Sequence, residues 1–354
     1  MYAFRSKRQR MLATTGAALA GVALLAGCSS DADNGEAEDD TDPGTEETTA
    51  PEEGGSGETV VIGFSGPAAD HGWLGAINTA ALDLAETYDD VDLRVAEGTN
   101  DPNLQISQVE TFVNEGVDVI VLLPTDGAAL TEAAINAMNA GVPVVNVDRE
   151  FSSSDAARVT ILGDNYGMGV SAGEYMCERL GDNPDAIIGE IAGIDSLQLT
   201  TDRSQGFEDA LSECGLDVDA RVAAEFTIDS GQEVTAQLLS ANPEFDAIWN
   251  HDDDQGIGVL AAIDEAGRDE FFMVGGAGSA NAMREIESGE SVLEATVIYP
   301  STQAADGIAL ARLLALDENM PALASPGIPR RIVLDAPVVT ADNVADYMDI
   351  GFES

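Results

Sequence analysis

Residues 119–126 read VIVLLPTD, five apolar residues in a row followed by a proline, a hydroxyl and a carboxylate. A strand exposed on one face alternates apolar and polar residues, whereas a strand covered on both faces is apolar throughout. Residues 119–123 therefore predict a strand inside a parallel sheet with helices on both sides. Because ligands of open α/β sheets bind beyond the carboxyl ends of the strands, the polar residues after Leu123 mark the edge where a site is expected.

The same kind of apolar run recurs along the chain, separated by amphipathic helical stretches. The runs are residues 60–64, 93–96, 117–123, 142–147, 186–191, 221–226, 247–250, 272–275 and 293–298. The helical stretches include residues 76–87, 104–115, 128–140 and 257–266. This alternation implies right-handed crossovers and parallel sheets. About ten strands are too many for one typical open sheet, so we expect two.

The charge balance narrows the range of partners. The chain of 354 residues has 65 Asp and Glu against 15 Lys and Arg, a formal net charge of -50. Phosphate would be repelled over most of the surface, so we expect no nucleic-acid partner. The simplest interpretation is a solvated acidic surface. An alternative hypothesis is adaptation to high salt, which screens the repulsion between like charges.

The N-terminal residues 1–27 have the pattern of a secretory signal peptide. A basic start that contains Arg5 and Lys7 precedes the apolar stretch 17–26, which is too short for a membrane-spanning helix. The stretch ends in LAGC at residues 25–28, which resembles the lipobox of bacterial lipoproteins. The resemblance implies that Cys28 carries a lipid that anchors the exported chain to the outer face of the cell membrane.

The segment after Cys28 reads as a tether, residues 28–57. Between residues 29 and 57 there are eleven acids and no bases, with several Thr, Gly and Pro. Such a composition cannot bury enough apolar surface to offset its chain entropy, so we expect a disordered linker between the lipid and the folded body.

Two further cysteines, Cys177 and Cys214, lie near the ends of predicted helices that flank the run at residues 186–191. An exported chain permits a disulfide between them, and two buried free thiols are the alternative. The only histidines are His71 and His251. Because no Cys/His spacing suits a metal ion, we expect neither a metal nor a cofactor.

The residues that follow the predicted strands are polar, as a ligand rich in hydroxyl groups requires. Carboxylates accept hydrogen bonds from adjacent hydroxyls, Arg and Asn donate to the same ligand, and an aromatic face covers the C–H side of a sugar ring. These strand-end segments are residues 65–73, 100–101, 125–126, 148–149, 163–165 and 251–254. Trp73 and Tyr299 are the aromatic residues suited to cover a ring.

Several of these segments together resemble a known family. They are LPTD at 123–126, VPVVNVDR at 142–149, GDN at 163–165, RSQGF at 203–207 and the pair Asp252-Asp253. They are similar to segments of the ribose-type sugar-binding proteins of ABC importers, and the likeness runs from about residue 60 to residue 339. It implies the type I periplasmic-binding-protein fold, two doubly wound parallel-sheet α/β domains joined by three chain crossings, with a ligand between them.

The resemblance also implies domain bounds, because the crossings would fall near residues 162, 299 and 333. The first lobe would comprise residues 58–162 and 300–333. The second lobe would comprise residues 163–299 and 334–354.

The family's ligand-binding residues carry over by position. Asp148 and Arg149 match its sugar-binding Asp-Arg pair, and Arg203 matches its second ligand-binding arginine. Asn100 lies near the Asn that follows the second strand, and Trp73 replaces a Phe that covers the sugar ring. The alternatives are a structural ion pair for Asp148 and Arg149, a surface position on its helix for Arg203, and core packing for Trp73.

Four more residues complete the predicted site. Asp252 takes the place of a ligand Asn, and Tyr299 stands where the family has a hinge Gln. Asp70 and His71 fall in the first loop beside the site. A second departure is VGGA at residues 274–277, where the family has a ligand Asp after its strand. Asp164, Asn165 and Asp253 are expected to be hinge or helix-cap residues rather than ligands.

These features predict a monomeric, exported lipoprotein that captures a sugar or polyol between two lobes and delivers it to the permease of an ABC importer. One alternative is a sugar or signal-molecule sensor that presents its ligand to a receptor. A second is a glycoside-processing enzyme that uses clustered carboxylates. No Ser-His-Asp or metal spacing supports catalysis, so we predict no enzyme.

Overall fold

The computed structural model describes residues 59–181, 183–320 and 327–354. The predicted signal peptide 1–27, the predicted lipidation site Cys28 and the predicted tether 28–57 lie outside the described residues.

The described chain forms two six-stranded sheets, and the first has the order β11-β5-β4-β3-β1-β2 with every neighbouring pair parallel. Its strands are β1 (Val60–Ser65), β2 (Val91–Val95), β3 (Val119–Leu122), β4 (Val144–Val147), β5 (Val159–Gly163) and β11 (Arg331–Leu334). All of β3 and β4 is buried. The run that predicted a strand covered on both faces is therefore such a strand.

The second sheet has the order β12-β10-β9-β8-β6-β7. Its strands are β6 (Ile188–Ala192), β7 (Ala220–Ala223), β8 (Ala247–Asn250), β9 (Phe272–Ala277), β10 (Leu293–Ile298) and β12 (Val338–Thr340). The pairs are parallel except that β12 runs antiparallel to β10 at the edge. The predicted strand 221–226 is wrong at its end, because β7 stops at Ala223 and leaves Phe226 in the following loop.

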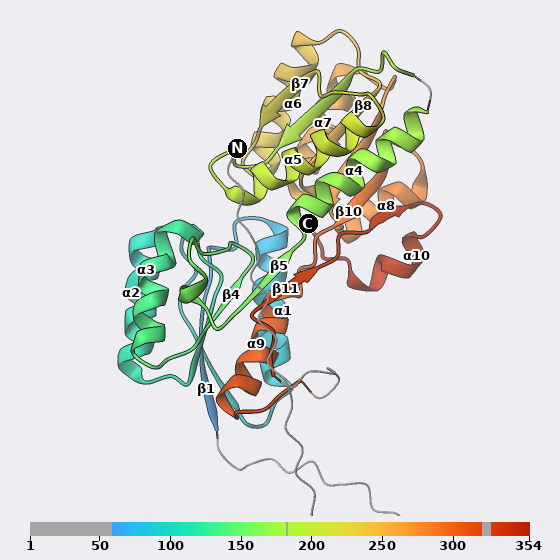
Figure 1. The fold of residues 1–354 in the computed structure, drawn as a ribbon. Coiled ribbons are helices and arrows are strands. Elements are labelled where there is room, and N and C mark those ends of the chain that lie inside the picture. Colours follow the sequence, from blue (N-terminus) through green and yellow to red (C-terminus); the bar gives the residue numbers. More distant parts are fainter. Residues whose placement is uncertain (1–58, 182, 321–326) are drawn as a thin grey trace, which may run out of the picture. The chain divides into compact units, whose positions relative to one another are not determined.

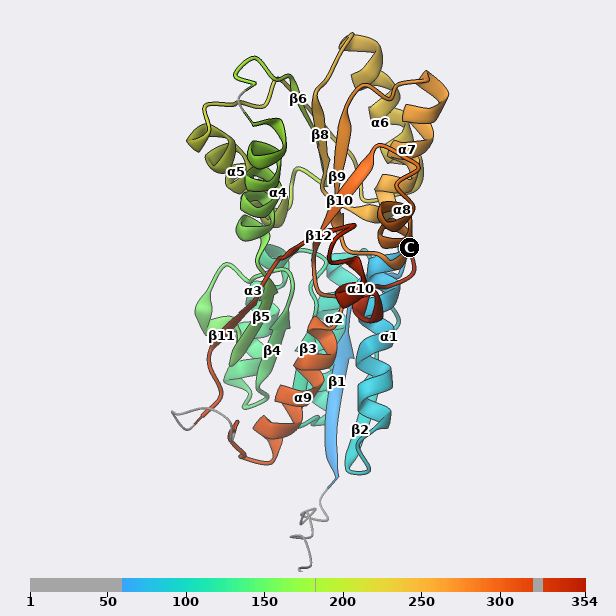
Figure 2. The ribbon, with the colours of Figure 1, turned by 90° about the vertical axis from the view of Figure 1, so that its right-hand side faces the viewer.

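Helices cover both faces of each sheet. They are α1 (Gly72–Glu86), α2 (Pro102–Glu115), α3 (Gly127–Asn139), α4 (Asn165–Leu180), α5 (Gln198–Glu213), α6 (Ile228–Ala241), α7 (Asp253–Ala266), α8 (Ala280–Ser288), α9 (Gln303–Ala315) and α10 (Val344–Tyr347), with short 3₁₀ turns at Ser154–Ala156 and Met348–Ile350. Figure 1 shows α2 and α3 on one face of the first sheet, with α1 and α9 on the other. Figure 2 shows α4 and α5 on one face of the second sheet, with α6 and α7 on the other. The prediction of two doubly wound parallel-sheet domains is confirmed.

The chain passes between the two sheets three times. It leaves the first sheet after β5 and returns after β10, where α9 packs on β3 and β4. It leaves the first sheet again after β11 to form β12. We call the two parts, each a sheet with its helices, the first and the second domain.

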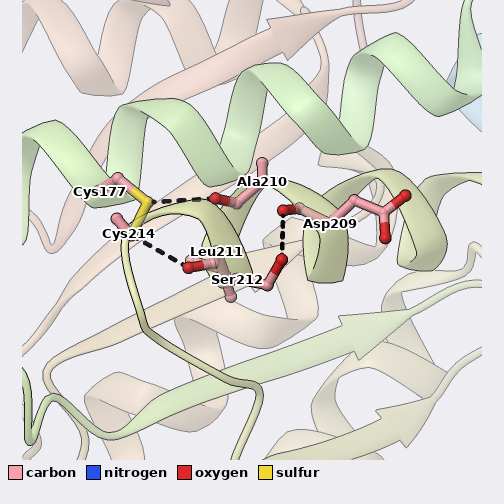
Figure 3. Close-up of a disulfide and its surroundings, with 6 residues drawn as sticks. All are labelled: Cys177, Asp209, Ala210, Leu211, Ser212 and Cys214. Carbon is pink, nitrogen blue, oxygen red and sulfur yellow. Dashed lines mark hydrogen bonds between the residues drawn. A yellow bond between two sulfur atoms is a disulfide. The ribbon is translucent and has the colours of Figure 1, made fainter.

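A disulfide fastens α4 to the loop after α5 in the second domain. Cys177 and Cys214 are joined with an S–S distance of 2.05 Å across a sequence separation of 37 residues (Figure 3). The two helices approach closely because Gly169 of α4 faces α5. A Cβ at Gly169 would lie 2.0 Å from the carbonyl oxygen of Arg203. In the described ranges, no helix has the length and apolar character needed to cross a bilayer.

Candidate functional site

Asp148 directly follows β4 and has an unusual backbone. Its φ of 64° lies in the left-handed region, which non-glycine residues rarely adopt. Residues with such backbone angles cluster at functional sites. The side chain is buried, and its Oδ1 accepts a hydrogen bond from the hydroxyl of Tyr299 at 2.5 Å. Its Oδ2 lies 3.7 Å from Nε of Arg149. Arg149 also donates from Nη1 to the carbonyl oxygen of Thr125 at 2.8 Å, which ties the ends of β3 and β4 together.

Arg203 is buried on α5 and does not occupy the surface position considered as its alternative. Its Nε donates to Oδ1 of Asn165 at 2.9 Å, and its Nη1 donates to the carbonyl oxygen of His251 at 3.0 Å. Its Cζ lies 4.5 Å from the ring centroid of Tyr299, in reach of a cation–π interaction. The guanidinium therefore joins α4, α5 and the end of β8.

Tyr299 lies at the centre of this group, at the second chain crossing. Its hydroxyl donates to Asp148 and accepts from Nδ2 of Asn165 at 3.1 Å. Its ring centroid lies 5.3 Å from that of Trp73, and the indole Nε1 of Trp73 donates to its carbonyl oxygen at 3.1 Å. Burial raises the pKa of Tyr299, and the negative charge of Asp148 raises it further. The phenol is therefore neutral and acts as a hydrogen-bond donor.

We define the central cluster as Trp73, Asp148, Asn165, Arg203 and Tyr299. All five side chains are buried, and they come from elements of both domains. Four of the five were predicted as ligand residues from the sequence. Asn165 was expected only to cap or hinge a helix, whereas its amide bonds both Arg203 and Tyr299.

Three other predicted residues form a separate, more exposed group in the first domain. Nδ2 of Asn100 donates to Oδ2 of Asp70 at 2.8 Å, and Nδ1 of His71 lies 2.7 Å from Oδ1 of the same carboxylate. The ring of His71 lies 6.4 Å from that of Phe226. Asp70, His71 and Asn100 thus position one another beside Phe226, away from the hydrogen bonds of the central cluster.

Asp252 caps α7 in the structure. Its Oδ1 accepts from the backbone N–H groups of Asp254 and Gln255 at 2.9 and 3.2 Å. Burial raises its pKa, and the neighbouring carboxylates of Asp254 and Asp253 raise it further. Asp253 was expected to satisfy free N–H groups at the start of this helix. It instead accepts from the backbone N–H of Gly276, within β9, and from that of Ser279, just after the strand.

Phe226 is a candidate that sequence reasoning missed. It has a φ of 59°, and Cζ of Arg203 lies 5.8 Å from its ring centroid. The apolar run at residues 221–226 predicts a strand that includes Phe226, whereas β7 ends at Ala223 and Phe226 lies in the loop after it. A shorter strand would have placed this aromatic ring among the loop residues that face a ligand.

A buried polar network supports Arg203 from within the second domain. Nε2 of His251 lies 2.9 Å from Oε1 of Glu190, and both side chains are fully buried. The hydroxyl of Ser204 donates to the same carboxylate, and Arg221 lies 3.4 Å from its other oxygen. Burial lowers the pKa of His251. Burial opposes ionisation of Glu190, but its hydrogen bonds and the nearby Arg221 lower its pKa overall.

A cavity of about 420 Å³ adjoins the central cluster and is within the usual size range for small-ligand sites. It is bordered by Asp148, Arg149 and Asn165, by the start of α3, and by residues 196–199 at the start of α5. Of the nine predicted ligand residues, only Asp148 and Arg149 border it. Trp73 and Arg203 do not border the cavity, and each packs against Tyr299, which does not border it either. No group of His, Cys, Asp and Glu within the described ranges is arranged to hold a metal ion.

The chain belongs to the periplasmic binding protein domain family, whose model matches residues 62–319. Among its curated relatives is the ribose import binding protein of Bacillus subtilis (strain 168), which is 30% identical over 221 residues, 60% of this chain and 70% of the relative. The likeness to ribose-type binding proteins inferred from the sequence segments is confirmed.

Two solved structures have the same fold. An ABC transporter solute-binding protein from Bacillus halodurans C-125 with bound myo-inositol matches with a TM-score of 0.73 and 24% identity, covering 82% of this chain and 98% of that one. The fructose-binding periplasmic domain of a hybrid two-component system matches with a TM-score of 0.72 and 26% identity, covering 82% of this chain and 93% of that one.

Proposed function

We propose that this protein is an exported solute-binding protein that holds a small hydroxylated ligand, a sugar or polyol, between its two domains for an ABC importer. The observation that carries the proposal is the central cluster with its adjoining cavity. Carboxylate, amide and guanidinium groups from both domains converge where strands end. Such groups suit a ligand whose hydroxyls both donate and accept.

The proposed mechanism is capture by hinge motion. A ligand that contacts Asp148 and Arg149 on one side and residues of the second domain on the other binds fully only when the domains are together. It therefore stabilises that arrangement through its differential affinity. The three chain crossings are suited to such a motion because each is a short connection. The proposed lobe bounds are residues 58–162 with 300–333 and residues 163–299 with 334–354.

The nine residues predicted from the sequence remain our candidates for ligand contact, with Phe226 and Asn165 added. Asp148 and Arg149 rank first because they alone among the nine border the cavity. Asp252 ranks last because capping of α7 already occupies its Oδ1.

We also propose that Cys28 carries a lipid after removal of residues 1–27, that the protein is a monomer, and that it catalyses no reaction. Mass spectrometry of the N-terminal peptide should find a diacylglyceryl group on Cys28. Cys28→Ala should shift the protein from the membrane fraction to the medium.

Product formation from incubated glycosides would contradict the absence of catalysis.

A sensor function is the second candidate, favoured by the likeness to the fructose-binding periplasmic domain of a two-component system. The ligand chemistry is the same in both functions and only the partner differs. Reconstitution with an ABC permease encoded nearby separates the two, because only an import protein should stimulate its ATPase activity.

A thermal-shift screen against pentoses, hexoses, polyols and cyclitols tests the proposed ligand class. A ligand present at 100 times its dissociation constant should add about 2.7 kcal/mol to the free energy of unfolding. Asp148→Asn should remove most of this shift. A screen in which only charged or apolar compounds shift the melting temperature would contradict the proposal.

A further inference from the structure

The N-terminus of helix α1 lacks a cap from its own segment. The first N–H groups of a helix have no partner within the helix and usually take one from the N-cap side chain. His71 occupies the N-cap position of α1 but makes no side-chain hydrogen bond to the helix. The helices α2 and α3 of the same domain are capped by their own residues Asp101 and Asp126.

The missing partner comes from the other domain. Oδ2 of Asp254, in the first turn of α7, accepts from the backbone N–H of Trp73 at 2.8 Å. Asp254 is buried, so this hydrogen bond is shielded from water. A carboxylate at a helix N-terminus is also favoured by the helix dipole. The second domain thus supplies the cap of a helix that packs on the first sheet.

The second domain also contacts the side chain of Trp73. Its indole N–H donates to the carbonyl oxygen of Tyr299, which directly follows β10 of the second sheet. The two aromatic rings are in contact, and Trp73 is buried. The second domain therefore binds Trp73 at both its backbone and its side chain.

The close approach at this point depends on Gly72. A Cβ added to Gly72 would lie 2.5 Å from Oδ1 of Asp254 and 2.6 Å from Cα of Ser354, both in the second domain. Gly75, one turn further along α1, has no atom of another element within 4 Å of such a Cβ. The two glycines form a matched pair in the same helix, one in the contact and one outside it.

We propose that Asp254 is a positioning residue that caps α1 across the two domains and so holds Trp73 against Tyr299. This contact stabilises the arrangement in which the two domains lie together. The inference needs no ligand, so it can be tested whether or not the proposed sugar or polyol binds.

The tryptophan content of the chain supplies the measurement. Trp73 and Trp249 are the only two tryptophans, and Trp249 is fully buried inside the second domain. A change in acrylamide quenching or in the emission maximum of the folded, ligand-free protein therefore reports on Trp73. The radius of gyration from X-ray scattering reports on the separation of the domains.

The experiment compares Asp254→Ala and Gly72→Ala with two controls, Asp101→Ala and Gly75→Ala. Asp101 caps α2 within its own domain, accepting from the N–H of Asn103 at 2.9 Å. We expect Asp254→Ala and Gly72→Ala to increase the quenching, shift the emission to longer wavelength and increase the radius of gyration. The controls should leave all three values at those of the parent protein, although Asp101→Ala lowers the melting temperature.

Gly72→Ala keeps the carboxylate of Asp254 and disturbs only the close approach of α1 to the second domain. The proposal therefore stays testable if Asp254→Ala folds poorly. Unchanged quenching and scattering in the test variants would overturn the proposal. It would also be overturned if Asp101→Ala gave the same change as Asp254→Ala. The loss of any helix cap would then be enough to raise the quenching and the radius of gyration, whether or not the cap joins the two domains.

Discussion

Replacement of Arg203 by alanine should destabilise the ligand-free protein strongly. The guanidinium makes two buried hydrogen bonds, to Asn165 and to the carbonyl oxygen of His251, and lies over the ring of Tyr299. Hydrogen bonds from a charged donor contribute about 1.5–3 kcal/mol each, and the cation–π contact about 1–2 kcal/mol. Removal of a buried charge recovers part of its desolvation energy. We therefore expect a net loss of about 3–5 kcal/mol.

Urea unfolding followed by tryptophan fluorescence is the assay, because Trp249 reports on the domain that contains α5. Its ring lies 4.7 Å from that of Phe207, which is on the same helix as Arg203. Arg179→Ala is the matched control. Arg179 is half exposed and pairs with Glu294 on the surface, so its loss should lower stability by less than about 1 kcal/mol.

A double-mutant cycle with Asn165→Ala isolates the hydrogen bond between the two side chains. Because the residues are in direct contact, we expect a coupling energy of about 1–3 kcal/mol. The reasoning is refuted if Arg203→Ala destabilises the protein no more than Arg179→Ala does. A coupling energy near zero would refute the contribution assigned to Asn165.

Three further outcomes follow from the structure. The free energy of unfolding of the double variant Cys177→Ser/Cys214→Ser should be about 4 kcal/mol lower, as the chain-entropy model gives for a separation of 37 residues. A urea midpoint equal to that of the parent protein would contradict this prediction. Burial raises the pKa of Asp253 to about 7, so below that pH the folded state binds more protons than the unfolded state. The free energy of unfolding should therefore increase as the pH falls from 8 to 5. The increase should be smaller in Asp253→Asn, which has no proton to bind at this position. Tyr299→Phe leaves Asp148 without its phenolic donor and should lower the melting temperature by several degrees, whereas an unchanged melting temperature would argue against the bond.

The fold could be predicted because its signals are local. A strand covered on both faces must be apolar at every position, and residues 119–123 are fully buried as that pattern requires. Three strands, β5, β11 and β12, are not among the predicted apolar runs, and β12 also runs antiparallel to its neighbour β10. Strand β12 has only three residues, and only its central residue, Val339, is buried, so its sequence carries little periodicity.

The candidate site was only partly predictable from the sequence. Strand-end position and family resemblance identified Asp148, Arg203 and Tyr299, which the structure brings together. They did not indicate that the hydroxyl of Tyr299 bonds Asp148 and Asn165, because Tyr299 is 151 and 134 residues away from them and the contact depends on how the two domains meet. The role of Asp254 was missed for the same reason, since its partner Trp73 is 181 residues away.

The most direct test of the account is a crystal structure of the protein with the sugar or polyol that gives the largest thermal shift. The account predicts one ligand between the two domains, with hydroxyl groups within hydrogen-bond distance of Asp148 and Arg149 and with contacts to residues of the second domain. A ligand bound to one domain alone, or on an outer surface away from Asp148, would contradict it.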